Sequence, residues 1–133
     1  MSSTETMKCL LVDDDQCMLE ILSRTVEMLG FESVTACDGD EGFTVFCECH
    51  PDLVVSDIHM PNRNGLLLLH DIKEIAPDIP VILITGFIHY KAIIAMEKAM
   101  PDAFVEKPFT IGQLRAAIEK VIPTIKRGLN GNG

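Results

Sequence analysis

Short apolar segments rich in Val, Ile and Leu alternate along the chain with longer segments of mixed polarity. The short segments carry apolar residues at consecutive positions, which is typical of strands buried on both faces of a parallel sheet. Most of them stop abruptly at a polar residue. Strands are therefore predicted at residues 8–12, 32–36, 53–57, 80–85 and 103–106.

The longer segments predict amphipathic helices, because their apolar residues recur every three or four positions. Asp15 and Thr110 are suitable N-caps for the first and last of these helices, and Gly30 suits the end of the first. Helices are predicted at residues 15–29, 39–48, 65–75, 90–100 and 110–122.

Strand–helix units in succession predict a single α/β domain, with a parallel sheet covered by helices on both faces. We expect this domain to occupy residues 8–123. Residues 1–7 are expected to be a flexible amino terminus, and residues 124–133 a flexible tail or the start of a linker.

The excess of acidic residues argues against some classes of binding partner. The chain has 11 Lys and Arg against 20 Asp and Glu, a formal net charge of −9. Such a surface repels phosphate backbones and anionic lipids, so direct binding to nucleic acid or membranes is not expected. The polar amino terminus, the absence of a long apolar run and five irregularly spaced cysteines predict a cytoplasmic protein.

The segment Cys47-Glu48-Cys49-His50 has residue types that bind metals. It lacks the second pair of ligands that a zinc site requires, so buried or half-buried free thiols are expected there.

Residues able to do chemistry follow the strands, at the edge of the sheet where open α/β proteins bind ligands. The first strand runs into Asp13, Asp14 and Asp15, of which Asp15 is expected to serve only as a helix cap. The third and fourth predicted strands end in Asp57 and Thr85, and the fifth runs into Lys107, which precedes Pro108.

Several carboxylates at one edge repel one another unless a cation is present, and Mg²⁺ suits such a set of oxygen ligands. With a cation in place, Asp57 can act as a nucleophile and form an acyl phosphate. Lys107 and Thr85 would then face the phosphoryl oxygens. The histidines are scattered along the chain and predict no base that activates water.

Motifs at these strand ends resemble those of the response regulator receiver domain, in the order and at the intervals of that family. The resemblance spans residues 8–122 and implies a doubly wound, flavodoxin-like (βα)5 fold of the CheY type, with strand order 2-1-3-4-5. The motifs are Leu11-Val12-Asp13-Asp14-Asp15, Asp57-Ile58-His59-Met60-Pro61-Asn62-Arg63-Asn64-Gly65, Ile84-Thr85-Gly86 and Phe104-Val105-Glu106-Lys107-Pro108-Phe109.

The resemblance implies that Asp57 accepts a phosphoryl group from a histidine kinase or a phosphotransfer protein. Asp14, Asp57 and the main-chain oxygen of His59 would hold Mg²⁺, with Mn²⁺ as a substitute, and Asp13 would act through a metal-bound water. Thr85 and Lys107 would contact the phosphoryl oxygens.

The resemblance also implies a switch in which Thr85 moves toward the phosphate and Phe104 moves inward; the alternative for Phe104 is plain core packing. Gly86 leaves little side chain beside Thr85, which opens the site to small phosphodonors or water. The supporting positions are Pro61, Gly65, Gly86 and Pro108, the last with a cis peptide bond after Lys107.

The implied output surface consists of the predicted helix 90–100, strand 103–106 and helix 110–122, with His89, Tyr90, Lys91 and Lys98 facing either a partner or solvent. It would control a downstream protein or a linked output domain, and it would allow a phosphorylation-dependent dimer. The domain is expected to be a switch that assists its own phosphoryl transfer and autodephosphorylation rather than an enzyme.

Three alternatives remain open from the residues. A magnesium-dependent phosphatase of the haloacid-dehalogenase type also uses an aspartate nucleophile, but Cys17 stands where Thr or Val is expected and the chain has no room for a cap domain. A flavin mononucleotide carrier needs an anion-binding loop after the first strand, where this chain has aspartates. The third is a receiver-like interaction module that is not phosphorylated.

Overall fold

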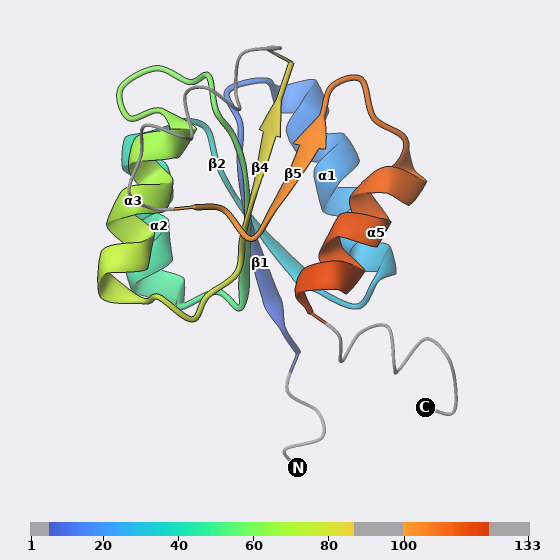
Figure 1. Cartoon of the computed structure of the whole chain (residues 1–133), viewed down its shortest axis with the longest axis horizontal. Coiled ribbons are helices and arrows are strands. Elements are labelled where there is room, and N and C mark those ends of the chain that lie inside the picture. Colours follow the sequence, from blue (N-terminus) through green and yellow to red (C-terminus); the bar gives the residue numbers. More distant parts are fainter. Residues whose placement is uncertain (1–5, 87–99, 123–133) are drawn as a thin grey trace.

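A parallel five-stranded sheet forms the centre of the molecule in the computed structural model, which describes residues 6–86 and 100–122 (Figure 1). The order β2-β1-β3-β4-β5 confirms the predicted topology. The strand bounds agree with the sequence pattern except that β4 begins one residue after Pro80. The strands are β1 (Lys8–Val12), β2 (Glu32–Ala36), β3 (Leu53–Asp57), β4 (Val81–Thr85) and β5 (Ala103–Glu106).

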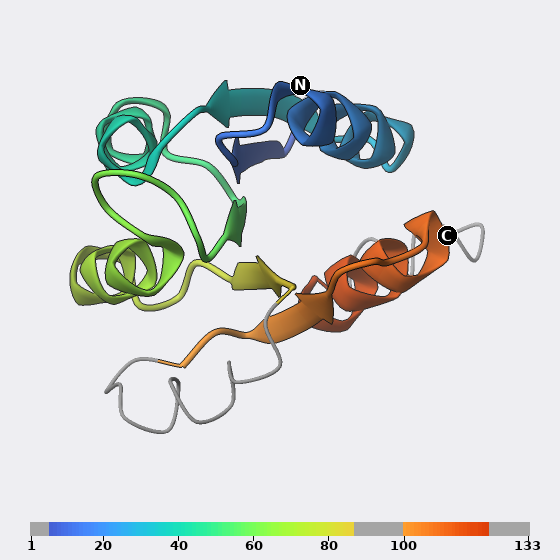
Figure 2. The ribbon, with the colours of Figure 1, turned by 90° about the horizontal axis from the view of Figure 1, so that it is seen from above.

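Helices cover both faces of the sheet, with α1 and α5 on one side and α2 and α3 on the other (Figures 1 and 2). The predicted helix at 90–100 falls almost wholly outside the described residues. Among those residues, no helix is long and apolar enough to span a membrane. The helices are α1 (Gln16–Met28), α2 (Gly39–Cys49), α3 (Gly65–Ile75) and α5 (Ile111–Val121).

Successive side chains of the inner strands point to opposite faces of the sheet, so the core consists of two apolar clusters, one on each face. On β1, Cys9 and Leu11 pack with α1 and α5, whereas Leu10 and Val12 pack with α2 and α3. Every residue of β3 and β4 is buried, as consecutive apolar positions predict. The expectation is wrong for β2 and β5, where only Ala36 and Val105 are buried, because these strands lie at the two edges of the sheet.

Side-chain caps fix where the helices start. The carboxylate of Asp15 accepts hydrogen bonds from the main-chain N–H groups of Cys17 and Met18, at 3.0 and 3.4 Å, which confirms its predicted role. Thr110 and Gln113 form the reciprocal bonds of a capping box at the start of α5. Each such cap is worth about 1 kcal/mol and holds the preceding strand end in place.

Two glycines allow the loop between β3 and α3 to pack closely on its surroundings. A Cβ atom on Gly65 would overlap the main-chain oxygen of Asp57, and one on Gly39, at the start of α2, would overlap the main-chain oxygen of Arg63. The Gly65 N–H also donates to the Ile58 carbonyl at 2.8 Å. The segment that follows Asp57 is therefore held tightly against β3 and α2.

We predict that Gly39→Ala destabilises the domain by about 1–3 kcal/mol, because backbone must shift to make room for the new methyl group. Gly112→Ala is the matched control. A Cβ there meets only the Thr110 hydroxyl, at 3.7 Å, so it should be neutral or stabilising by up to about 1 kcal/mol. Urea unfolding followed by circular dichroism measures both, and equal effects would contradict the close contact at Gly39.

Candidate functional site

Three carboxylates meet where β1 and β3 end side by side. Val12 pairs with Ser56 in the sheet, so the residues that follow each of them, Asp13 and Asp57, are neighbours. One carboxylate oxygen from each of Asp13, Asp14 and Asp57 lies within 4.8 Å of the others. The structure thus brings together the acidic residues that the sequence placed at this edge of the sheet.

Asp13 is the most constrained member of the group. Its Oδ1 accepts a hydrogen bond from the Asp15 N–H at 2.9 Å, while its buried Oδ2 has no hydrogen-bond partner. Burial raises the pKa of Asp13 from its ordinary 3.8 to about 6; the charges of Asp57 and Asp14 add to the rise, and the Asp15 N–H and Lys107 oppose it. The protein alone therefore does not fully compensate this carboxylate.

Asp57 presents one oxygen to the site and keeps the other engaged. Its Oδ1 accepts the main-chain N–H of Ile58 at 2.9 Å, and its Oδ2 accepts a bond from the Lys107 ammonium at 3.4 Å. The side chain is only 9% exposed. The backbone therefore holds Oδ1, whereas Oδ2 faces the Lys107 ammonium.

Lys107 enters from the other side of the site, directly after β5. Its N–H donates to the Thr85 carbonyl at 2.8 Å, and its ammonium lies 3.9 Å from Asp13 Oδ2 as well as near Asp57. The peptide bond between Lys107 and Pro108 is cis, as the resemblance implied. Thr85 is buried at the end of β4, so residues from four strand ends share one edge of the sheet.

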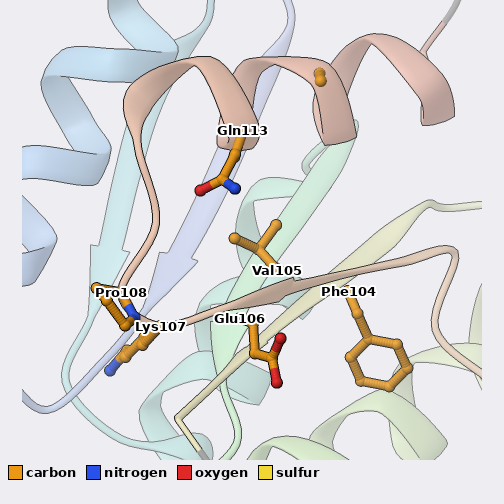
Figure 3. Close-up of a pocket in the computed structure, with 7 residues that line it drawn as sticks. Phe104, Val105, Glu106, Lys107, Pro108 and Gln113 are labelled. Atoms are coloured by element: carbon orange, nitrogen blue, oxygen red, sulfur yellow. The ribbon is translucent and has the colours of Figure 1, made fainter.

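Phe104 and its neighbours line a pocket of about 500 Å³ beside the site (Figure 3). Val105 points toward α5, whereas Phe104 points to the opposite side of β5. There the partly buried Phe104 ring packs against the apolar cluster that includes Leu83. Its packing in this structure agrees with both interpretations of Phe104, as a core residue and as a switch.

Other predicted positions lie around this centre. A Cβ atom on Gly86 would lie 3.7 Å from Cβ of Lys107, so Gly86 borders the site. The side chains of His59 and Pro61 are exposed on the loop after β3. His89, Tyr90, Lys91 and Lys98 lie outside the described residues.

The other chemically suggestive residues do not form a site in the described part of the chain. The acidic group is the one cluster of potential metal ligands found there, and it contains no histidine or cysteine. Cys49 is half-buried as expected, but Cys47 is exposed, because it lies on the outer face of α2 while Phe46 faces the core.

Sequence reasoning missed the contacts that hold the loop between β3 and α3. Asn62 donates from Nδ2 to Asp38 at 3.0 Å, and Arg63 forms ion pairs with Asp40 and Asp71. The pairs that reach Asp38 and Asp40 join residues far apart in the sequence, and a loop arginine carries no local pattern that identifies its partners.

The raised pKa of Asp13 predicts that the metal-free protein loses free energy of unfolding as the pH rises. A carboxyl group with a raised folded-state pKa stabilises the fold below its unfolded pKa, and this stabilisation is lost as the pH rises through about 6. Asp13→Asn should therefore be more stable than the wild type above pH 6, by on the order of 2 kcal/mol, and nearly equal to it at pH 4. Urea titrations with a chelator measure this difference; an advantage that does not grow with pH would contradict it.

A family model described as the response regulator receiver domain matches residues 9–119 of the chain. The probable transcriptional regulator ycf27 of Cyanophora paradoxa is 36% identical over 115 residues, covering 86% of this chain and 48% of that protein. The C4-dicarboxylate transport transcriptional regulatory protein DctD of Pseudomonas aeruginosa is also 36% identical, over 85% of this chain and 24% of its own length. The chain thus spans about half or less of these curated relatives.

Solved structures agree with the family match. A response regulator receiver domain protein from Clostridium thermocellum has a TM-score of 0.79 and 33% identity, over 92% of this chain and 98% of that one. The response regulator TrrA from Thermotoga maritima, in complex with Mg²⁺-BeF, has a TM-score of 0.79 and 31% identity, over 87% of this chain and 99% of that one. This chain belongs to the response regulator receiver domain family, the switch module of two-component signalling.

Proposed function

We propose that the domain works by accepting a phosphoryl group on Asp57 from a histidine kinase or a phosphotransfer protein. The observation that carries this proposal is the arrangement of Asp57 Oδ2, which faces the Lys107 ammonium at 3.4 Å beside two further carboxylates. A nucleophilic oxygen, a fixed positive charge and an acidic cation-binding group are the elements that phosphoryl transfer to aspartate requires.

The acidic group fits a hard divalent cation. Asp13 Oδ2 is buried without a hydrogen-bond partner, and the Lys107 ammonium reaches only two of the three carboxylates, so a cation would supply the missing positive charge. We propose that Asp14, Asp57 and the main-chain oxygen of His59 hold Mg²⁺, or Mn²⁺ in its place, and that Asp13 acts through a bound water. TrrA, a relative with the same fold, was solved with Mg²⁺-BeF.

The transfer itself needs no further base. Asp57 Oδ2 attacks the phosphorus of the phosphohistidine donor, the new O–P bond forms as the P–N bond breaks, and the electron pair of that bond returns to the imidazole. Mg²⁺ would neutralise charge on the transferring oxygens. Lys107 is placed to contact one of these oxygens, and the Thr85 hydroxyl another.

The new anion then shifts the domain between two packings. A phosphoryl group on Asp57 adds negative charge and acceptor oxygens that attract Lys107 and Thr85. We propose that Thr85 moves toward the phosphate and that Phe104 moves inward into the space this leaves, which biases the population toward an active form. Because Phe104 has no hydroxyl, this output relies on packing alone.

The output is proposed to act on a downstream protein or a linked domain, through residues 90–100, β5 and α5. We propose that the domain occupies residues 8–123 and that residues 124–133 are a flexible tail or the start of a linker. The matched relatives named as transcriptional regulators are about twice as long as this chain or longer. Phosphorylation-dependent dimerisation through the same surface and a cytoplasmic location complete the proposal. The net charge of −9 opposes direct DNA contact by this domain.

Beryllofluoride tests the phosphoacceptor directly. With Mg²⁺ it should give a bound ¹⁹F NMR signal in the wild type and none in Asp57→Asn, because the neutral amide lacks the anionic oxygen that coordinates beryllium. Asp15→Asn is the matched control: it changes an acidic residue on the same loop to an equally good helix cap, and it should retain the signal. Equal binding to wild type and Asp57→Asn would refute the proposal.

Gly86 is proposed to leave the site open to small phosphodonors and to water. Valine at this position would stand beside Lys107, so Gly86→Val should slow both phosphorylation by acetyl phosphate and autodephosphorylation severalfold, with Gly86→Ala in between. Stopped-flow or Phos-tag measurements of both rates provide the test. Identical rates across the three proteins would show that access at this position does not limit either reaction.

A further inference from the structure

We infer that Arg63 is a positioning residue for the phosphoacceptor site, because it fixes the loop between β3 and α3 to both neighbouring helices. The inference rests on the proposed function of Asp57. Residues 58–64 connect Asp57 to α3, and the main chain of this loop is proposed to supply one oxygen ligand at His59. Whatever holds the loop therefore sets the position of that oxygen relative to the carboxylates.

The Arg63 side chain meets groups from two helices. Its guanidinium carbon lies 4.7 Å from the centre of the Phe43 ring on α2. Nε lies 3.2 Å from Asp40 Oδ1 on the same helix, and Nη1 lies 3.4 Å from Asp71 Oδ2 on α3. With only 24% of the side chain exposed, these contacts are partly shielded from water and hold the loop to both helices.

The backbone around Arg63 strengthens the same attachment. Gly39 packs so closely on the Arg63 carbonyl that no larger residue fits, and Asn62 donates a hydrogen bond to Asp38, the N-cap of α2, at 3.0 Å. Asn62 has a φ of 70°, a left-handed conformation that asparagine tolerates better than most residues. The middle of the loop is thus held in one conformation against the start of α2.

Lysine could not reproduce the full set of contacts. The planar guanidinium can stack on an aromatic ring while its nitrogens face two carboxylates, whereas an ammonium is a single point charge. The Arg63 side chain contacts Asp40, Asp71 and Phe43 rather than the acidic group at the strand ends. Its effect on the site must therefore pass through the loop, which predicts a change in cation affinity rather than in the chemical step.

The test is the Mg²⁺ dependence of beryllofluoride binding, followed by ¹⁹F NMR. Arg63→Met keeps the aliphatic stem and removes the charge. The Mg²⁺ concentration for half-maximal binding should rise about tenfold, as for other residues that orient metal ligands, while binding at saturating Mg²⁺ stays at the wild-type level. Arg63→Lys should recover part of the affinity. Asp71→Asn, which removes one of the two ion pairs of Arg63, should produce a smaller shift in the same direction.

Lys73→Met is the matched control for lost stability. The Lys73 ammonium donates hydrogen bonds to Asp102 and to the Ile79 carbonyl, each at 2.8 Å. Both partners lie before the amino ends of β4 and β5, away from the acidic group, and the Lys73 side chain is 17% exposed. This variant should lose stability in urea and keep the wild-type Mg²⁺ dependence.

The outcomes separate the two ideas. An unchanged Mg²⁺ dependence in both Arg63→Met and Asp71→Asn overturns the positioning role, and so does an equal shift in Lys73→Met. A wild-type protein that binds no beryllofluoride overturns the proposed function of Asp57, and the inference with it.

Discussion

Parallel strands β1 and β3 end side by side, and the residues that follow them carry negative charge that water cannot fully solvate. Asp13 and Asp57 are buried, Asp14 lies beside them, and Lys107 from β5 is the ammonium that reaches two of the three. The raised pKa of Asp13 shows the cost of this arrangement. The excess negative charge favours the binding of a cation, and in the proposed function that cation would also offset the charge of an added phosphoryl group.

The fold tolerates the repulsion among Asp13, Asp14 and Asp57 because short-range sequence signals strongly determine the strands and helices around them. Consecutive apolar residues fix β3 and β4 as fully buried strands, and Asp15 and Thr110 cap helices directly after strand ends. These are short-range signals, so the sequence alone was sufficient to predict the sheet, the described helices and the edge where the acidic residues meet. The order of the strands came from the family resemblance, since periodicity does not specify which strands are neighbours.

Features that depend on distant partners could not be predicted in the same way. The partial exposure of β5 follows from its place at the edge of the sheet, whereas the polar residues Glu32, Ser33 and Thr35 already indicate the exposure of β2. The ion pairs of Arg63 with Asp40 and Asp71 require α2 and α3 to be packed together first. Cys47 illustrates the same limit at smaller scale, because its exposure depends on which face of α2 meets the core.

The acidic group lies between the loop that follows Asp57 and Lys107, which follows β5, and the two are held by different contacts. On one side, Gly65, Asn62 and Arg63 fix the loop after Asp57 through close contacts and ion pairs. On the other side, the Lys107 ammonium lies 3.4 Å from Asp57 Oδ2, which is long for a hydrogen bond. Two unit charges about 4 Å apart interact by about 4 kcal/mol at an effective dielectric of about 20. Moving a two-state equilibrium from 1:99 to 99:1 takes about 5.5 kcal/mol.

In the proposed switch, only the difference between the contacts that Lys107 and Thr85 make before and after phosphorylation contributes to this free energy. The fixed side must not yield in response, or the same energy would be dissipated in moving the loop after Asp57. Rigidity around Arg63 is in this sense a condition for directing the conformational change toward β4 and β5.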